Sequence, residues 1–203
     1  MFITIEGPDG AGKSTQINNI KAFLEERGLS YIVTREPGGT PISEKIRDII
    51  LDKENKEMKP VTEALLYAAS RAQHVAQVIK PALNEGKVVI CDRFIDSSFA
   101  YQGSARELGD VVWDINKAAV DGCMPDVTFV FKLNPEVGLS RVKGRGAEDR
   151  LELEKLEFHK KVYEGYLKLE KEFPDRIVGI DANQSIQDIK EEIYKVLNAK
   201  LKG

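Results

Sequence analysis

Hydrophobic residues along the chain follow two alternating patterns. Short apolar runs rich in β-branched residues, typical of buried strands, are separated by longer segments with the periodicity of amphipathic helices. The pattern predicts strands at 2–6, 31–34, 88–92, 127–133 and 177–180, and helices at 13–26, 43–51, 61–84, 110–121, 135–143, 151–173 and 185–199. Such alternation favours an α/β fold in which a five-stranded parallel sheet is covered by helices on both faces, a three-layer α/β/α sandwich.

Composition narrows the class of protein. A chain of 203 residues that is 42% apolar is expected to form a single domain over residues 1–203. Its net charge of -3 gives no overall attraction to nucleic acid. No apolar run approaches the roughly 20 residues that span a membrane, and Met1 leads directly into a strand pattern without a signal segment. We therefore expect a cytoplasmic protein with neither nucleic acid nor membrane as partner.

The two cysteines, Cys91 and Cys123, are far apart in the sequence and lack the paired spacing of a zinc site. Both occur among apolar or small residues. We expect buried free thiols.

A glycine-rich turn, GPDGAGKS at residues 7–14, joins the first predicted strand to the first predicted helix. Its pattern, G-x-x-x-x-G-K-[ST], is that of the phosphate-binding P-loop, and the strand-turn-helix context supports it. The glycines let backbone N–H groups converge on phosphate oxygens, Lys13 supplies a cation, and Ser14 offers a hydroxyl to Mg²⁺. The segment predicts a bound nucleoside triphosphate with Mg²⁺ in a P-loop NTPase-like fold.

An acidic residue at the end of a second buried strand is expected to complete such a site. Asp92, in KVVICDRF, follows four apolar residues and is the candidate metal ligand beside Ser14. Its alternative role is only to cap the segment that follows.

A P-loop is compatible with a kinase, a GTPase switch or an ATPase motor. A GTPase needs Asn-Lys-x-Asp to read guanine, yet Asn116-Lys117 continues Ala-Ala, and no glycine stands three residues after Asp92. A motor needs a partner surface, for which 203 residues leave little room. These observations favour a small-molecule kinase.

A kinase of this kind needs a second anion site opposite the P-loop, for which arginine is well suited. Arginines at expected strand ends and loop mouths are Arg35, Arg47, Arg71 and Arg93. The basic segment RVKGRGAEDR, residues 141–150, reads as a loop between two helices. We expect it to form a lid, at about 141–151, that excludes water from the transferring phosphoryl group.

Five segments, in this order along the chain, carry a more specific resemblance: EGPDGAGKST, TREPGGT, LLYAASR, CDRFIDSSFAYQG and the basic segment ending DRLE. With them the sequence resembles the thymidylate kinase family in its bacterial type, P-loop enzymes that make dTDP from dTMP and ATP. The resemblance implies that ATP and Mg²⁺ are bound by Gly7, Pro8, Asp9, Gly10, Ala11, Gly12, Lys13, Ser14 and Thr15. It also implies a homodimer.

The same resemblance implies roles at the acceptor site. Asp9 reaches the sugar 3′-hydroxyl, and Tyr101 lies under the deoxyribose. The implied dTMP-binding residues are Asp9, Arg35, Glu36, Arg47, Tyr67, Arg71, Arg93, Ser98, Tyr101 and Gln102, of which Arg71, Ser98 and Gln102 read the thymine edge. The implied catalytic residues are Lys13, Arg93, Asp92, Arg141, Arg145 and Arg150, the last three in the lid, where they contact the donor phosphates.

Two positions qualify this picture. Gly10 stands where some relatives carry an arginine inside the P-loop, so the lid is expected to supply the catalytic positive charge. Tyr67 stands where the family usually has phenylalanine, which keeps an aromatic face for the base but adds a hydroxyl. A kinase for another nucleoside monophosphate, or an ATPase coupled to a partner, remains the alternative.

Overall fold

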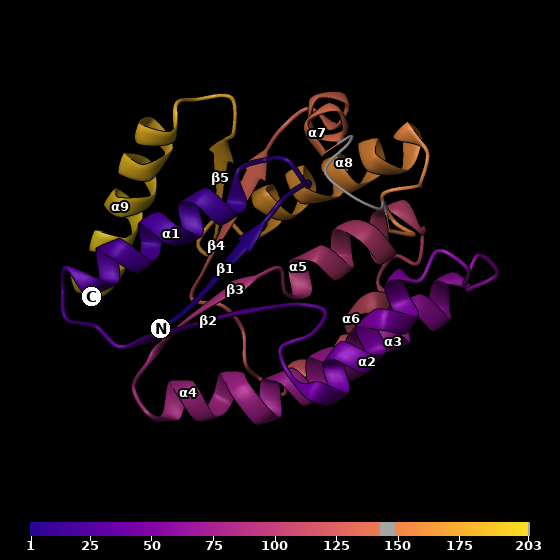
Figure 1. The fold of residues 1–203 in the computed structure, drawn as a ribbon, viewed down its shortest axis with the longest axis horizontal. Coiled ribbons are helices and arrows are strands. Elements are labelled where there is room, and N and C mark those ends of the chain that lie inside the picture. The colour runs from indigo at the N-terminus through magenta and orange to yellow at the C-terminus, as the bar shows by residue number, and fades with distance from the viewer. Residues whose placement is uncertain (143–148, 203) are drawn as a thin grey trace.

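The structure is a computed structural model that describes residues 1–142 and 149–202. Its described part is built around a parallel sheet of five strands in the order β2-β3-β1-β4-β5 (Figure 1). The strands are β1 (Phe2–Glu6), β2 (Tyr31–Arg35), β3 (Val88–Asp92), β4 (Val127–Lys132) and β5 (Ile177–Asp181). The central strand, β1, pairs with β3 on one side and with β4 on the other. The loop after β1 therefore opens where the chain changes direction across the sheet, the usual place for a ligand.

The helices are α1 (Lys13–Glu25), α2 (Pro41–Leu51), α3 (Pro60–His74), α4 (Lys80–Asn84), α5 (Ile95–Ser98), α6 (Val111–Val120), α7 (Pro135–Val142), α8 (Leu156–Glu172) and α9 (Ile186–Lys202), with π-helical segments η1 (Val75–Ile79) and η2 (Phe99–Ala105).

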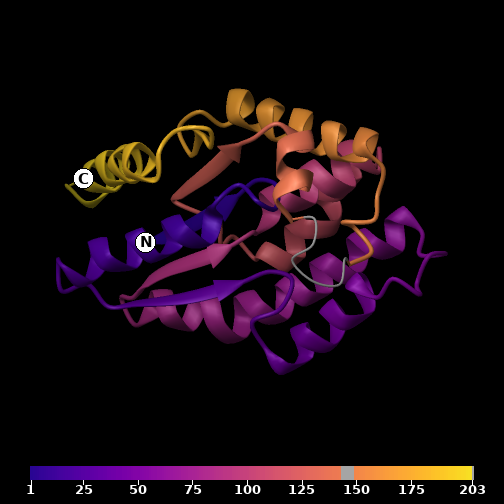
Figure 2. The ribbon, with the colours of Figure 1, turned by 45° about the horizontal axis from the view of Figure 1, so that its top comes forward.

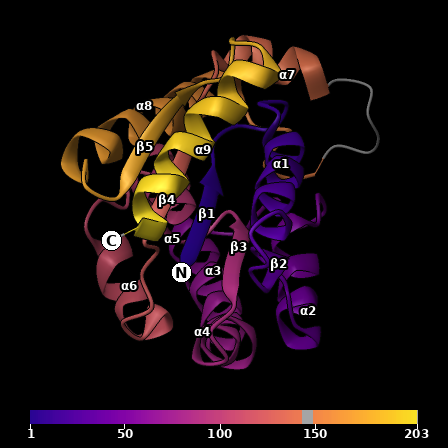
Figure 3. The ribbon, with the colours of Figure 1, turned by 90° about the vertical axis from the view of Figure 1, so that its left-hand side faces the viewer.

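Alternating side chains of the strands build two packed layers on the sheet. Ile3 and Ile5 of β1 pack with apolar residues of α1 and α9 on one face. Figure 3 shows α1 and α9 beside β1. Phe2 packs on the opposite face with side chains of η1, α4 and α6. Val130 of β4 packs on that same side with α8. This arrangement confirms the predicted α/β fold with a five-stranded parallel sheet between helical layers.

Two predicted helices differ from the structure, and one helical segment was not predicted. The predicted helix at 61–84 is divided into α3, η1 and α4; Pro81, near the second junction, lacks an N–H. The predicted helix at 151–173 begins at Leu156, because the Asp149 carboxylate accepts the N–H groups of Leu151 and Glu152, at 2.8 and 2.9 Å, in a turn instead. The helical segment 95–105 is absent from the prediction, since its serines and glycine are weak helix formers.

Cys91 and Cys123 are free and buried, which confirms their predicted state. In the described ranges, every helix is too short or too polar to cross a bilayer.

Candidate active site

A cavity of about 240 Å³ opens beyond the carboxyl ends of β1, β2 and β3. Its walls come from the loops after those strands, from α2, α3 and η2 on one side and from α8 on the other. Figure 2 shows α2 and α3, in purple, and α8, in orange, on opposite sides of the molecule. Nine of the ten predicted dTMP-binding residues line this cavity: Asp9, Arg35, Glu36, Arg47, Tyr67, Arg71, Arg93, Tyr101 and Gln102.

The P-loop borders the cavity through Pro8 and Asp9 and packs tightly against β4. Gly7 has φ 124°, and a Cβ there would meet the Phe131 carbonyl oxygen at 2.6 Å, so only glycine fits this turn. Gly12 caps α1 without a side-chain hydrogen bond, which leaves the helix N-terminus open to an anion. The loop therefore has the backbone geometry that a phosphate requires.

Lys13 is 7% exposed and binds the loop that carries it. Its Nζ donates to the carbonyls of Gly7 and Pro8, at 3.1 and 2.9 Å, and to Asp9 Oδ1 at 3.2 Å. Burial and the nearby Arg93 lower the pKa of Lys13. The cation is thus held beneath the loop, at the place where phosphates are expected.

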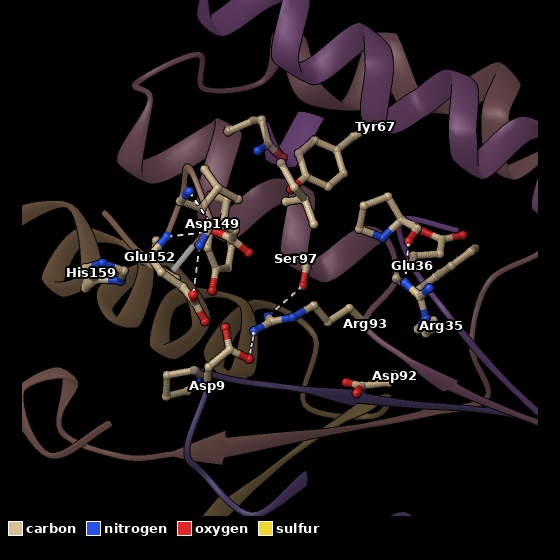
Figure 4. Close-up of a pocket in the computed structure, with 18 of the residues that line it drawn as sticks. Asp9, Arg35, Glu36, Tyr67, Asp92, Arg93, Ser97, Asp149, Glu152 and His159 are labelled. Atoms are coloured by element: carbon tan, nitrogen blue, oxygen red, sulfur yellow. Dashed lines mark hydrogen bonds and ion pairs between the residues drawn. The ribbon is translucent and has the colours of Figure 1, made fainter. Parts of the chain in front are cut away.

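Asp9 and Arg93 face each other across the floor of the cavity (Figure 4). Arg93 Nη2 donates to Asp9 Oδ1 at 3.0 Å, the same oxygen that Lys13 contacts. Although burial opposes ionisation, Arg93 and Lys13 hold the pKa of Asp9 well below its usual range. Burial likewise opposes the charge of Arg93, but Tyr101 and Asp9 keep its pKa raised. Asp9 therefore links the P-loop lysine to Arg93, an arginine of the predicted second anion site.

Two further arginines converge on one carbonyl. Arg35 and Arg47 both donate through Nη1 to the carbonyl oxygen of Pro37, at 3.2 and 3.0 Å, and Arg35 also pairs with Glu44 at 2.8 Å. The peptide bond before Pro37 is cis. Burial and the charge of Arg35 lower the pKa of Arg47. Placing like charges together in this way favours an anionic ligand between them.

Arg71 is 1% exposed and its guanidinium is held from several sides. Nε donates to Glu36 Oε2 at 2.8 Å, Nη1 to Ser98 Oγ at 3.0 Å and to Asn116, and Nη2 to the Phe94 carbonyl at 3.0 Å. One of its five N–H groups, on Nη2, is left without a partner in the described chain.

Two predicted dTMP-binding residues, Ser98 and Glu36, are hydrogen-bonded to Arg71. Ser98 accepts a hydrogen bond from Arg71 and is not among the residues that line the cavity, so it positions the arginine; its contact with a base stays a prediction. Glu36 lines the cavity, but its carboxylate is shared between Arg71 and His74 Nδ1, at 2.8 and 3.0 Å. A buried carboxylate is stable only when paired, which explains why both oxygens turn inward.

Aromatic rings form part of the cavity wall. Tyr67 lines it, and burial raises the pKa of its hydroxyl. Tyr101 lies with its ring centroid 5.4 Å from the Arg93 guanidinium carbon, and burial raises its pKa to about 12. Both hydroxyls therefore stay neutral. The rings provide apolar faces on which a planar ligand could stack.

Asp92 ends β3 beside the P-loop strand, and the next N–H, of Arg93, donates to the Ile5 carbonyl at 2.9 Å. Asp92 Oδ1 is buried and has no hydrogen-bond partner in the described part of the chain. Ser14, in the first turn of α1, is exposed. A buried, unpaired carboxylate oxygen and a hydroxyl are the hard ligands that suit Mg²⁺, so these residues fit the predicted metal.

The predicted lid arginines are separated in the structure. Arg141, at the end of α7, donates through Nη1 to the carbonyl of Gly10 at 3.2 Å and so reaches the P-loop. Arg145 lies outside the described residues. Arg150 is 9% exposed and donates to the Ile50 carbonyl at 2.8 Å and to Glu63 at 2.6 Å. Because Arg150 is bound by this buried carboxylate, the arrangement does not support its predicted contact with donor phosphate.

Glu6, Ser97 and Tyr166 form a buried cluster under Arg93 that sequence reasoning missed. Glu6 accepts the N–H groups of Phe94 and Ser97, at 2.7 and 3.2 Å, and the hydroxyls of Ser97 and Tyr166, at 2.5 and 2.9 Å. Arg93, which directly precedes Phe94, has φ 67°, a strained conformation for arginine. The hydrogen bonds to Glu6 hold the backbone in this strained turn. In the sequence, the cluster is signalled only by the glutamate that precedes the first P-loop glycine.

Burial, together with the Asp96 charge, raises the pKa of Glu6 to about 7 from an ordinary 4.5. An acid with a raised native pKa stabilises the fold below its unfolded pKa and loses that contribution as the pH rises through the native value. We expect the unfolding free energy of wild type, measured relative to that of Glu6→Gln, to fall by up to about 3 kcal/mol as the pH rises from about 4.5 to about 7. Chemical denaturation across this range measures it, with the exposed Glu57→Gln as control. A pH-independent difference for Glu6→Gln contradicts the assignment.

Both histidines of the chain lie at or near the cavity. His74 is fully buried and contacts Glu36 and Thr34 at the edge of the site. His159 of α8 lines the cavity, and burial lowers its pKa. Ser97, Tyr163 and Tyr166 line the cavity as well. Only the fold brings residues so distant in sequence to one wall.

Comparisons with known proteins find a matching family model, curated relatives and a solved structure. A family model described as thymidylate kinase matches residues 5–193. Curated relatives named thymidylate kinase include one from Clostridium novyi, 55% identical over 95% of both chains, and one from Lactobacillus acidophilus, 54% identical over 98% of this chain and 94% of the relative. A crystal structure of thymidylate kinase from Ehrlichia chaffeensis superposes with a TM-score of 0.76 and 32% identity, covering 98% of each chain.

Proposed function

Because the chain belongs to the thymidylate kinase family of phosphotransferases, we propose that it transfers the γ-phosphoryl group of ATP to dTMP, giving dTDP and ADP, with Mg²⁺ bound to the nucleotide. The observation that supports these substrates best is the placement of Arg93, Arg35 and Arg47 on a cavity next to the P-loop. The P-loop takes the donor phosphates, and the three guanidinium groups take the acceptor phosphate. Two anion sites that share Asp9 at their border suit transfer between two nucleotides.

In the proposed reaction an oxygen of the dTMP phosphate attacks the γ-phosphorus in line. A bond to that oxygen forms while the bond to the β–γ bridging oxygen breaks, and ADP leaves. An ionised phosphate is already a nucleophile, so the chain's main contribution is to position the two phosphates and neutralise their charge. Lys13 and Arg93 serve this purpose from opposite sides. Ser14 and Asp92 would hold the Mg²⁺, which would supply positive charge to neutralise the donor phosphates.

The base is proposed to lie between Tyr67 and the arginine-bearing face of the cavity. Arg71 has one unpaired N–H on Nη2, which suits a carbonyl oxygen on the base. Tyr101, buried beside Arg93, is proposed to contact the deoxyribose, and Asp9 Oδ2 is proposed to reach the 3′-hydroxyl, since Oδ1 is already engaged.

Three other expectations remain proposals. Arg141 supports a lid at about 141–151, because the described end of that segment already contacts the P-loop; Arg145 of that lid lies outside the described residues. The resemblance implies a homodimer. Sedimentation equilibrium should therefore give the mass of two chains, and the mass of one chain would contradict this expectation. The cytoplasmic location stays a prediction.

A panel of nucleoside monophosphates with ATP tests the proposed acceptor. We expect dTMP to react well ahead of dCMP, dGMP and AMP, and dUMP to be weaker by about 10-fold or more, because a missing methyl group costs about 1 to 3 kcal/mol in an apolar pocket. ADP release measured by a coupled assay gives kcat/KM for each. AMP as the best acceptor would assign another monophosphate kinase activity. Hydrolysis without any acceptor, stimulated by a protein or nucleic acid, would favour the ATPase alternative.

A further inference from the structure

Glu63 of α3 is a buried carboxylate that the proposed mechanism does not use. It is 1% exposed, and three side chains from two other segments donate to it. Gln102 Nε2 donates to Oε1 at 2.8 Å, Arg106 Nη2 to Oε2 at 3.1 Å and Arg150 Nη2 to Oε2 at 2.6 Å. Only Gln102 among these partners lines the cavity.

The surroundings of Glu63 keep it ionised. Burial acts against the charge, yet hydrogen bonds from Gln102 and Arg106 hold the pKa of Glu63 below its usual range. An ionised carboxylate only accepts hydrogen bonds. It therefore accepts the amide NH₂ of Gln102, whereas a flipped amide would place two acceptor oxygens at the 2.8 Å contact.

The orientation of this amide decides what Gln102 offers to a ligand. With Nε2 bound to Glu63, the carbonyl oxygen Oε1 is directed away from it and has no partner in the described chain. Among the described residues, the unpaired side-chain atoms that are fully buried are Asp92 Oδ1 and His159 Nε2. Gln102 Oε1 is not one of them, so this unpaired oxygen is accessible from the cavity. Gln102 therefore presents a hydrogen-bond acceptor to the cavity, while Arg71 presents a donor.

A donor and an acceptor on one cavity wall match a ring edge that carries a carbonyl oxygen next to an N–H, the imide edge of thymine or uracil. Cytosine has an unprotonated ring nitrogen where thymine has this N–H, so it would place an acceptor against Gln102 Oε1. We infer that Glu63 is a positioning residue that sets the base specificity of the site by fixing the amide orientation of Gln102. This inference rests on the proposed binding of the base beside Gln102.

The experiment compares kcat/KM for dTMP with kcat/KM for dCMP. Glu63→Gln can donate as well as accept, so it no longer fixes the Gln102 amide, and we expect the dTMP/dCMP ratio to fall at least about 10-fold. Arg106→Gln is the matched control, because it weakens the same buried network but leaves the carboxylate facing Gln102. Its ratio should stay within about twofold of wild type. An unchanged ratio in folded Glu63→Gln, or an equal fall in Arg106→Gln, overturns the inference.

If Glu63→Gln does not fold, Gln102→Met provides a second test of the same inference. With Glu63 intact, this variant should lose the same part of the dTMP/dCMP ratio, and an unchanged ratio overturns the inference. In a Gln102→Met background, Glu63→Gln should have no further effect on the ratio, since it acts through the missing amide. Wild type measured first separates this result from the proposed function: if wild type does not prefer dTMP, the proposed substrate has failed and not the role of Glu63.

Discussion

Lys13→Ala is expected to remove almost all phosphoryl transfer while the protein stays folded. Each charge-assisted hydrogen bond to a phosphate contributes about 1.5 to 3 kcal/mol, so losing contacts to both the β- and γ-phosphates should lower kcat/KM at least about 100-fold. The fold should persist, because among the described residues the Lys13 ammonium donates hydrogen bonds only to Gly7, Pro8 and Asp9 of its own loop. ADP release with dTMP gives the rate, and thermal melting followed by circular dichroism gives the fold.

Lys21→Ala is the matched control for this variant. It removes a lysine from the same helix, whose ammonium donates to Asn18 at 3.5 Å, and should leave the rate unchanged. Near-normal activity of Lys13→Ala would reject the assignment of the P-loop lysine to the donor phosphates. Loss of activity together with loss of the melting transition would instead show that Lys13 is needed for folding.

Arg93→Ala should lower kcat/KM for dTMP about 100-fold, while KM for ATP changes little. The guanidinium faces the acceptor cavity and binds Asp9 at 3.0 Å, so its loss removes a cation from the acceptor phosphate. Alanine keeps a Cβ at φ 67°, so the backbone strain is nearly unchanged and the effect reports the side chain. Steady-state kinetics with each substrate varied in turn measure the two constants.

Two further variants sharpen the Arg93 result. Arg93→Lys keeps the charge but not the planar fork, and should have intermediate activity. Arg27→Ala removes an arginine that packs on Phe23, among residues that do not line the cavity, and should behave as wild type. A weaker KM for ATP with normal use of dTMP would move Arg93 from the acceptor site to the donor site.

The sequence alone was sufficient for the P-loop, the fold class and the family. Gly7, Gly12, Lys13 and Ser14 are close along the chain, because one turn must bring backbone N–H groups, a cation and a hydroxyl to one phosphate. Five apolar runs alternating with helical patterns predicted the parallel sheet, because buried strands and the buried faces of helices each require apolar residues at a characteristic spacing. The predicted family is confirmed by the comparisons.

The buried polar network needed the tertiary structure. Glu6 and Tyr166 are 160 positions apart, and Glu63 and Arg150 are 87 apart, so no local pattern announces either contact. The direction of a charged side chain depends on which partners burial brings to it. The sequence accordingly did not predict that Arg150 contacts Glu63 or that Ser98 contacts Arg71.

What the sequence determined by itself is therefore local chemistry: a loop for phosphate, arginines near strand ends and the alternation that builds the sheet. What only the tertiary structure decided is which of those arginines face the cavity and which are held behind it. The physical reason is the cost of burying a charge or an amide without a partner. Because of this cost, Arg71 is paired with Glu36 and the Gln102 amide is hydrogen-bonded to Glu63. Only the folded chain brings these partners together.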